Sequence, residues 1–183
     1  DPGVCGGQVE VFVEPILPPP LLVVIGAGHV GKAVVHLAKW LGFRVAVNDD
    51  RPEFCTPEFA PGADAYYPVT MDKLPEHIKI DKRTILILTT RGSSVDAAGM
   101  LPLLDSAASY IGVIGSRRRW ATTVKALKEK GVSEEKIARV HSPIGLELQA
   151  ETPEEIAVSI MAEVMMQKAK ATGMPMKAKQ ATD

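Results

Sequence analysis

The chain has 183 residues, a formal net charge of -1 and 46% hydrophobic residues, which suits one domain with a sizeable buried core. The balanced charge argues against a protein that coats nucleic acid, and no apolar run approaches the roughly 18 residues that a membrane span needs. The first residues form no signal segment, and two cysteines are too few for a disulfide framework. We therefore predict a soluble, cytoplasmic domain that binds neither nucleic acid nor a membrane. Since the chain starts with Asp1 rather than Met, we also expect the natural protein to be longer.

The two ends of the chain differ from its middle. Residues 8–14 alternate polar and apolar side chains, as a half-buried strand does, and residues 18–20 are prolines that favour an extended spacer. We therefore predict that residues 1–20 are the remnant strand of an N-terminal domain followed by a proline-rich linker. A single cofactor-binding domain is expected over residues 21–171, and a flexible tail over residues 172–183.

From residue 21 onward, apolar strands alternate with amphipathic helices. Unbroken apolar runs are typical of strands that are covered on both faces. The predicted strands are residues 21–25, 44–48, 84–88, 110–114 and a short one within 138–141, and the predicted helices are residues 28–41, 94–104 and 116–130. This alternation predicts an α/β fold with a doubly wound, mostly parallel sheet and helices on both faces.

One further helix has a well-marked beginning near the end of the domain. Thr152 is a good N-cap, Pro153 suits the first helical position, and Glu155 completes the pattern of a capping box. The helix that follows carries a methionine-rich apolar stripe. We expect this stripe to pack against the core, and an interface with a partner is the alternative.

A glycine-rich loop, residues 26–31, lies between the first predicted strand and the first predicted helix. Gly26 permits a tight turn, Gly28 lets a phosphate approach the backbone, and Gly31 allows the helix to pack closely on the strand. The start of the helix supplies free amides and a positive potential for an anion. We predict a nucleotide or phosphate-ester site here that includes His29 and Val30, although a spacer role for His29 and a tight turn with an empty site remain alternatives.

An acidic residue follows this loop at the spacing of a dinucleotide-binding fold. Asp49 ends the second predicted strand, 18 positions after Gly31, and is expected to accept hydrogen bonds from ribose hydroxyls. Arg51 lies beside it and could accept a 2′-phosphate, so the preferred nucleotide stays open. Together with the strand pattern, these residues make the predicted fold Rossmann-like.

Two more segments follow predicted strands and lie at the same edge of the sheet. Thr90 and Arg91 end the third long strand. Gly115 and Ser116 come before a turn of three arginines, of which Arg117 and Arg118 are included in the predicted site, while solvated arginines are the alternative. Because open α/β sheets bind ligands at the carboxyl ends of their strands, we expect all these residues to contribute to one cofactor-binding site.

The sequence contains no recognisable motif for catalysis. It contains no Ser-His-Asp order, no zinc-ligand spacing and no P-loop lysine. A nucleotide-dependent dehydrogenase also needs a second domain to bring substrate to the cofactor, and residues 21–171 are used by one domain. We therefore predict no catalytic residue and leave any metal ligand unassigned.

Several of these segments resemble one known family, the XdhC/CoxI family of xanthine dehydrogenase accessory proteins, in its C-terminal Rossmann domain. The resemblance covers about residues 4 to 168 and is most specific in its last three segments. The matching segments are residues 5–7, 26–31 and 49–51, residues 90–92 with Asp96, and residues 111–119, 142–146 and 152–163.

The resemblance implies a function. Members of this family are understood as chaperones that bind the molybdenum cofactor, hold it during sulfuration and help to insert it into molybdenum hydroxylases such as xanthine dehydrogenase. A hydroxylase of this type and a cysteine desulfurase are thus the expected partners, a homodimer is possible, and the glycine loop would hold the phosphate of the cofactor or of its nucleotide form. An NAD(P)-binding regulatory domain, or the cofactor half of an oxidoreductase, remains the alternative.

The sequence departs from the family pattern in three places. Ser93 replaces a histidine that often follows the Thr-Arg-Gly segment, and Gln149 stands where a glycine is usual. We expect residues 1–17 to be all that this chain carries of the family's N-terminal domain, in which another cysteine-containing motif is found. We therefore expect this chain to be the cofactor-binding half of a chaperone.

Overall fold

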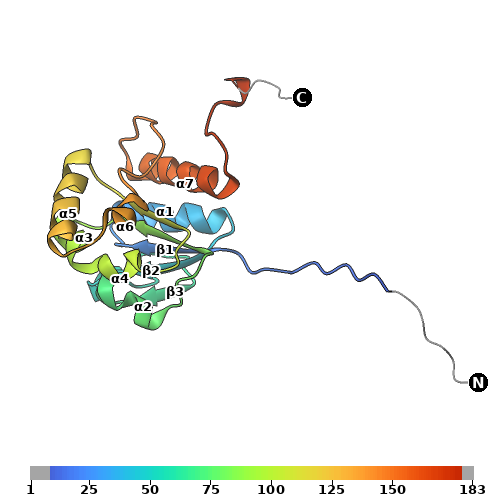
Figure 1. The fold of residues 1–183 in the computed structure, drawn as a ribbon, viewed down its shortest axis with the longest axis horizontal. Helices are drawn as coiled ribbons and strands as arrows, with labels where there is room; N and C mark the ends of the chain where they lie inside the picture. Colours follow the sequence, from blue (N-terminus) through green and yellow to red (C-terminus); the bar gives the residue numbers. More distant parts are fainter. Residues whose placement is uncertain (1–8, 179–183) are drawn as a thin grey trace, which may run out of the picture.

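The computed structural model of the chain describes residues 9–178. Six strands form one parallel sheet in the order β3-β2-β1-β4-β5-β6 (Figure 1). The strands are β1 (Leu21–Ile25), β2 (Arg44–Asn48), β3 (Ala65–Tyr67), β4 (Thr84–Leu88), β5 (Tyr110–Val113) and β6 (Val140–His141). This order is that of a doubly wound dinucleotide-binding fold, with the chain reversing direction across the sheet beside β1. The predicted fold class is confirmed, and all the pairings are parallel.

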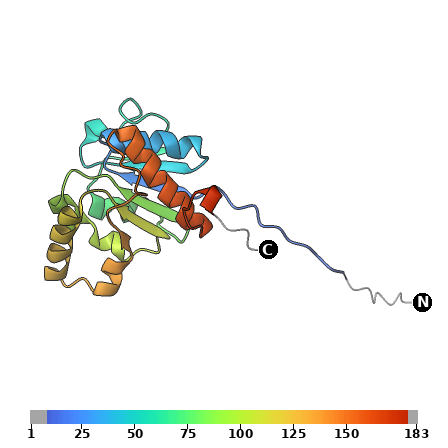
Figure 2. The same cartoon turned by 90° about the horizontal axis from the view of Figure 1, so that it is seen from above.

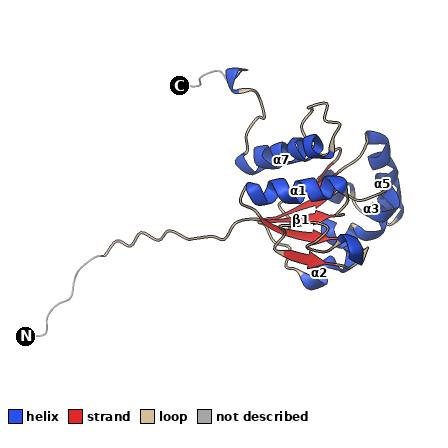
Figure 3. Cartoon of the chain, turned by 180° about the vertical axis from the view of Figure 1, so that it is seen from behind, coloured by secondary structure: helices blue, strands red, loops and turns tan. Residues whose placement is uncertain are grey.

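Helices cover both faces of the sheet. On one face α1 packs beside α7, as two views of the chain show (Figures 2 and 3), and α3 to α6 lie on the other. The helices are α1 (His29–Trp40), α2 (Leu74–His77), α3 (Ser93–Gly99), α4 (Leu101–Leu104), α5 (Arg117–Glu129), α6 (Glu134–Ala138) and α7 (Pro153–Ala169), with short 3-10 turns at Pro52–Phe54, Met71–Lys73 and Met176–Ala178. No helix among the described residues is long and apolar enough to cross a membrane.

The central strand β1 shows why these apolar runs become buried strands. Leu22 and Val24 point into the core below α1 and α7, whereas Val23 and Ile25 point into the core below the opposite helices. Because successive side chains of a strand face opposite sides, a sheet with helices on both faces needs apolar residues at every position.

The last helix begins as predicted. The Thr152 hydroxyl accepts a hydrogen bond from the Glu155 amide at 3.2 Å, and the Glu155 carboxylate accepts one from the Thr152 amide at 3.1 Å. Hydrogen bonds from the amides of Glu151 and Thr152 lower the pKa of the Glu155 carboxyl. The methionine-rich stripe packs mainly into the core, where Met161 is buried, while Met165 is half-exposed.

Two predicted elements differ from the structure. The helix expected over residues 94–104 is split into α3 and α4 at Met100. A Cβ on Gly99 would lie 2.7 Å from the Cβ of Met71, so the chain needs a glycine there to pack closely, and Pro102 removes an amide from the next turn. The strand expected over residues 8–14 is wrong for its described part. Residues 9–20 form no strand, because none of the described strands pairs with them. The segment instead extends away from the sheet (Figure 1).

Candidate functional site

The glycine loop joins β1 to α1 in the tight turn that the sequence predicts. Gly26 adopts φ +102°, and a Cβ there would lie 2.7 Å from the Thr89 carbonyl oxygen. A Cβ on Gly31 would collide with the carbonyl oxygen of Gly26. The turn and the close approach of α1 to β1 therefore require both of these glycines, whether or not a ligand is present.

Gly28 is different. Its backbone has φ -60°, which any residue adopts, and no protein atom lies within 4 Å of the position that a Cβ would take. Packing within the described residues therefore gives no reason for a glycine here. The open space beside the Gly28 backbone is what a ligand needs in order to approach the loop closely.

The first turn of α1 is open to an anion. This helix has neither a side-chain cap nor an acidic residue in its first turn. The amides of His29, Val30 and Gly31 donate to no acceptor among the described residues. The other long helices, α5 and α7, have side-chain caps from Ser116 and Thr152. Free amides and the positive end of the helix dipole favour a phosphate or carboxylate at the start of α1.

Asp49 holds the glycine loop against the end of β2. Its carboxylate accepts a hydrogen bond from the Ala27 amide at 2.8 Å and three more from Arg51, through the amide, Nε and a terminal nitrogen, at 2.9–3.0 Å. The Asp49 side chain is 1% exposed. The hydrogen bonds with Asp49 raise the pKa of the Arg51 guanidinium, which also lies over the Phe54 ring at 3.7 Å. In this structure Asp49 is thus a fixed part of the loop.

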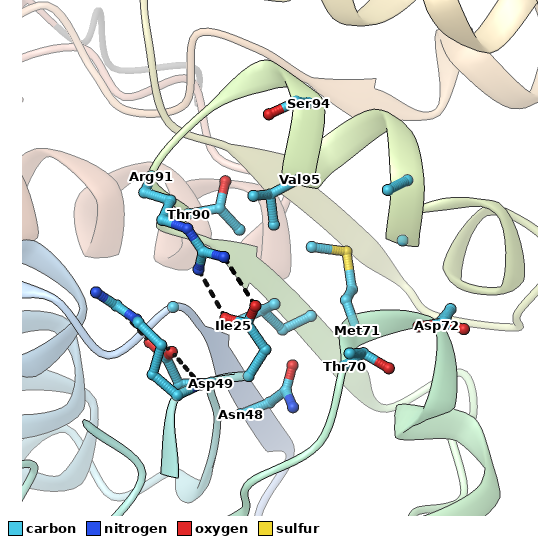
Figure 4. Close-up of a pocket in the computed structure, with 15 residues that line it drawn as sticks. Ile25, Asn48, Asp49, Thr70, Met71, Asp72, Thr90, Arg91, Ser94 and Val95 are labelled. Atoms are coloured by element: carbon cyan, nitrogen blue, oxygen red, sulfur yellow. Dashed lines mark hydrogen bonds and ion pairs between the residues drawn. The ribbon is translucent and has the colours of Figure 1, made fainter. Parts of the chain in front are cut away.

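A second ion pair joins the ends of β2 and β4. Arg91 donates two hydrogen bonds to the two carboxylate oxygens of Asp50, at 2.6 and 2.8 Å. This pairing lowers the pKa of the Asp50 carboxyl and raises the pKa of the Arg91 guanidinium. Figure 4 shows the Arg91 side chain extending from the end of β4 toward the end of β2, where Asn48 and Asp49 lie.

These residues border a cleft of about 310 Å³ at the carboxyl ends of the strands (Figure 4). Its lining comes from the ends of β1 and β2, from residues 70–72 and from residues 90–99. Met71 and Val95 give the cleft an apolar wall, whereas Asp50 and Arg91 make its rim polar. This combination suits a ligand with a flat, apolar part and a polar edge.

Behind the cleft wall lies a buried ion pair. Arg119 donates hydrogen bonds to the Asp96 carboxylate at 2.8 Å and to the Thr90 hydroxyl at 2.7 Å, and the Thr90 hydroxyl also bonds to Asp96. Asp96 is fully buried. Because Thr90 lines the cleft, this pair fixes the position of the segment that carries Thr90 and Arg91.

The structure brings together five of the predicted site residues and separates the others. The cleft is lined by Gly26, Asp49, Arg51, Thr90 and Arg91. The other eight predicted residues are not part of that lining: Gly28, His29, Val30, Gly31, Gly115, Ser116, Arg117 and Arg118.

His29 and Val30 have different surroundings. His29 faces a separate groove between α1 and α7, and Val30 packs partly into the core.

Ser116 caps α5, as predicted. Arg117 and Arg118 are exposed, and of the three arginines only Arg119 turns inward. Successive side chains on a helix fan around its axis, and the buried Asp96 carboxylate attracts the one guanidinium that reaches it.

Sequence reasoning missed two important parts of the cleft. Asp50 was not predicted, because Asp49 already lies at the spacing expected for the acidic residue of a dinucleotide-binding fold. Two adjacent acidic residues at the end of a strand were nevertheless a signal that could have indicated it. Met71 lies in a stretch without a clear pattern.

No group of three metal-ligating side chains occurs among the described residues. Burial raises the pKa of the Cys55 thiol, so this thiol stays protonated.

Comparison with known proteins identifies the family. The model of the XdhC Rossmann domain matches residues 22–164. The chain belongs to the XdhC Rossmann-domain family. The predicted resemblance is therefore confirmed, within the part of the chain that the family model covers.

Three similar proteins place this domain within longer chains. It is 36% identical over 170 residues to the uncharacterized protein YqeB of Escherichia coli K12, and 31% identical over 156 residues to a Bacillus subtilis protein named as a probable xanthine dehydrogenase subunit. These matches cover 92% and 85% of this chain but 31% and 45% of the relatives. A crystal structure of a xanthine dehydrogenase from Bacillus halodurans superposes with a TM-score of 0.72 at 28% identity, over 91% of this chain and 45% of that one. The chain thus spans less than half the length of these proteins.

Proposed function

We propose that this domain binds the molybdenum cofactor, or its nucleotide form, through the phosphate end of that ligand, within a cytoplasmic protein that serves the maturation of xanthine dehydrogenase-type molybdenum hydroxylases. The observation that carries the proposal is Gly28, the one glycine of the loop whose small size the protein's own packing does not require. A phosphate that contacts the backbone at this point would account for it.

The surrounding residues fit an anionic ligand. The amides of His29, Val30 and Gly31 are free to donate to phosphate oxygens, and Asp49 fixes the loop that presents them. The cofactor would supply redox chemistry through its molybdenum only after transfer to a hydroxylase. This chain's own part is to bind, orient and shield the ligand.

Family membership and the names of two similar proteins support the proposal that a molybdenum hydroxylase receives the cofactor. The Bacillus subtilis relative and the Bacillus halodurans structure both carry xanthine dehydrogenase in their names. We therefore propose a molybdenum hydroxylase as the receiving partner and, from the family resemblance, a cysteine desulfurase as the enzyme that acts on the bound cofactor. Self-association into a homodimer belongs to the same proposal.

A second candidate function is binding of NAD(P). The strand order and the acidic end of β2 are features of dinucleotide-binding domains, and they favour this alternative. Hydride transfer with purines or aldehydes, followed through the absorbance of the reduced cofactor, would establish this second function. The chaperone proposal expects no such turnover.

The direct test is to identify what the domain carries. The chain is purified from a host that makes the molybdenum cofactor and from a host that lacks its synthesis, and both samples are studied by mass spectrometry and elemental analysis. We expect a pterin phosphate with molybdenum only in the first sample. Absence of any pterin from that sample, with NAD(P) found in its place, would overturn the proposal in favour of the alternative.

A further inference from the structure

Two adjacent carboxylates end β2, and they differ in the number of hydrogen bonds that they can still accept. A carboxylate has about four acceptor positions on its two oxygens. Asp49 accepts four hydrogen bonds, from the Ala27 amide and from three nitrogens of Arg51. With its side chain almost completely buried, Asp49 has no acceptor position left for a ligand.

Asp50 has acceptor positions to spare. Among the described residues the only side chain that donates to Asp50 is Arg91, which gives one hydrogen bond to each oxygen and leaves a further acceptor position on each. The Asp50 side chain is 31% exposed and lines the cleft. The paired guanidinium also holds the carboxylate in one orientation, since it forms two parallel hydrogen bonds to it.

Two free acceptor positions, one on each oxygen, match a pair of neighbouring hydroxyl groups. A ribose with free 2′- and 3′-hydroxyls presents such a donor pair, and its base would lie against the apolar wall formed by Met71 and Val95. The phosphate would then extend toward Gly28 and the start of α1. A 2′-deoxyribose would leave one acceptor position of Asp50 unused.

The charges around the cleft favour an unphosphorylated ribose. The lining contains three carboxylates, Asp49, Asp50 and Asp72, against two guanidiniums, Arg51 and Arg91. Both guanidiniums are already paired, whereas Asp72 has no ion pair among the described residues. A 2′-phosphate placed here would meet an excess of negative charge.

We propose that Asp50 is the specificity-determining carboxylate of this cleft, and that it selects a ribonucleotide with free 2′- and 3′-hydroxyls. The inference rests on the proposed function in one respect, that the glycine loop binds a phosphate. It changes the role predicted for Asp49, which becomes a positioning residue that holds the loop through Ala27.

The test measures selectivity for the sugar. Calorimetry with the full chain compares ribonucleoside 5′-diphosphates with their 2′-deoxy counterparts, and NAD with NADP. We expect each ribonucleotide to bind at least about tenfold more tightly than its deoxy form, which corresponds to one hydrogen bond with a charged group. We expect NAD to bind more tightly than NADP by a similar factor.

Substitutions then assign the selectivity to one residue. The Asp50→Ala variant should bind ribose and deoxyribose forms equally, whereas Asp49→Asn should weaken both alike by loosening the loop. Asp105→Ala is the matched control, because Asp105 is a half-exposed carboxylate paired with Lys136 and is not part of the cleft lining. Its preference for ribose should equal that of the unaltered chain.

Several results would overturn the inference. Equal affinity of the unaltered chain for ribose and deoxyribose forms would do so, as would a ribose preference that persists in Asp50→Ala. Failure of every nucleotide to bind at about 1 mM would also overturn it, while a pterin phosphate found on the purified chain would leave the proposed function standing. Nucleotide binding without any pterin would support this inference and contradict the cofactor proposal.

Discussion

Tyr110, the first residue of β5, donates a hydrogen bond from its hydroxyl to the Glu163 carboxylate of α7 at 2.7 Å. The other carboxylate oxygen accepts the Gly145 amide at 2.5 Å, and the His141 ring stacks on Tyr110 with 4.5 Å between centroids. Burial and the bond to Glu163 raise the pKa of the Tyr110 phenol, so it remains a donor throughout the neutral range. One buried carboxylate thus connects α7, β5 and the loop after β6.

Removal of this carboxylate should destabilise the domain. In Glu163→Ala the Tyr110 hydroxyl and the Gly145 amide lose their acceptor, and each buried group left unpaired costs about 1–3 kcal/mol. We expect the free energy of unfolding to fall by roughly 2–4 kcal/mol in urea titrations. Gln167→Ala, an exposed position on the same helix, serves as the control. Equal stability of the two variants would show that the connection contributes little.

The same hydroxyl predicts a loss of stability in alkali. An unfolded tyrosine ionises near its ordinary pKa of 10.0, whereas the pKa of native Tyr110 is higher. The stabilising contribution is therefore complete below about pH 10 and declines as the pH rises above that value. The melting temperature should fall more steeply between about pH 9 and 11 in the unaltered chain than in Tyr110→Phe. Parallel curves would contradict this.

The three consecutive arginines should differ sharply in importance. Arg119→Ala would leave the fully buried Asp96 carboxylate without its ion partner, which typically costs about 3–5 kcal/mol. Arg117→Ala and Arg118→Ala change exposed positions and should stay within about 0.5 kcal/mol of the unaltered chain. Denaturant titrations of the three variants provide the comparison, each serving as a control for the others. A similar loss in all three would refute the assignment.

Gln149 occupies a backbone conformation that favours glycine. Its φ is +51°, in the left-handed region, at the position where the family resemblance leads one to expect glycine. Gln149→Gly should therefore raise the free energy of unfolding by about 0.5–1 kcal/mol, while Gln149→Ala, which keeps a Cβ, should bring no gain. Thermal unfolding distinguishes the two, and a less stable glycine variant would show that the Gln149 side chain has a role of its own.

The long buried strands could be predicted because one physical pattern determines them. The bounds of β1, β2 and β4 agree with the predicted ranges, since a strand covered on both faces is apolar at every position. β3 and α6 were not predicted because each is short, so neither shows enough periods of a pattern to be recognised. The break before α4 depends on contact between Gly99 and Met71, which are distant in sequence.

The site was predicted in outline but not in its pairings. The loop glycines and the strand ends carry local signals, and the cleft formed at that edge of the sheet. The choice of Arg119 over Arg117 depends on helix rotation relative to the buried Asp96, which residue spacing alone does not give. Likewise, the sequence does not show that Ala27 and Arg51 occupy the acceptor positions of the Asp49 carboxylate, because these hydrogen bonds form only when folding brings the residues together.

The central claim is that the backbone at Gly28 contacts a phosphate of the bound cofactor. The most direct measurement compares the pterin and molybdenum content of the unaltered chain and of Gly28→Ala, both purified from a host that makes the cofactor. Since nothing within 4 Å opposes a Cβ at this position, the variant should unfold at the same temperature as the unaltered chain. We expect its cofactor content to fall at least about tenfold, since a Cβ blocks close approach of the ligand. A folded Gly28→Ala variant that retains a full complement of cofactor would contradict the account.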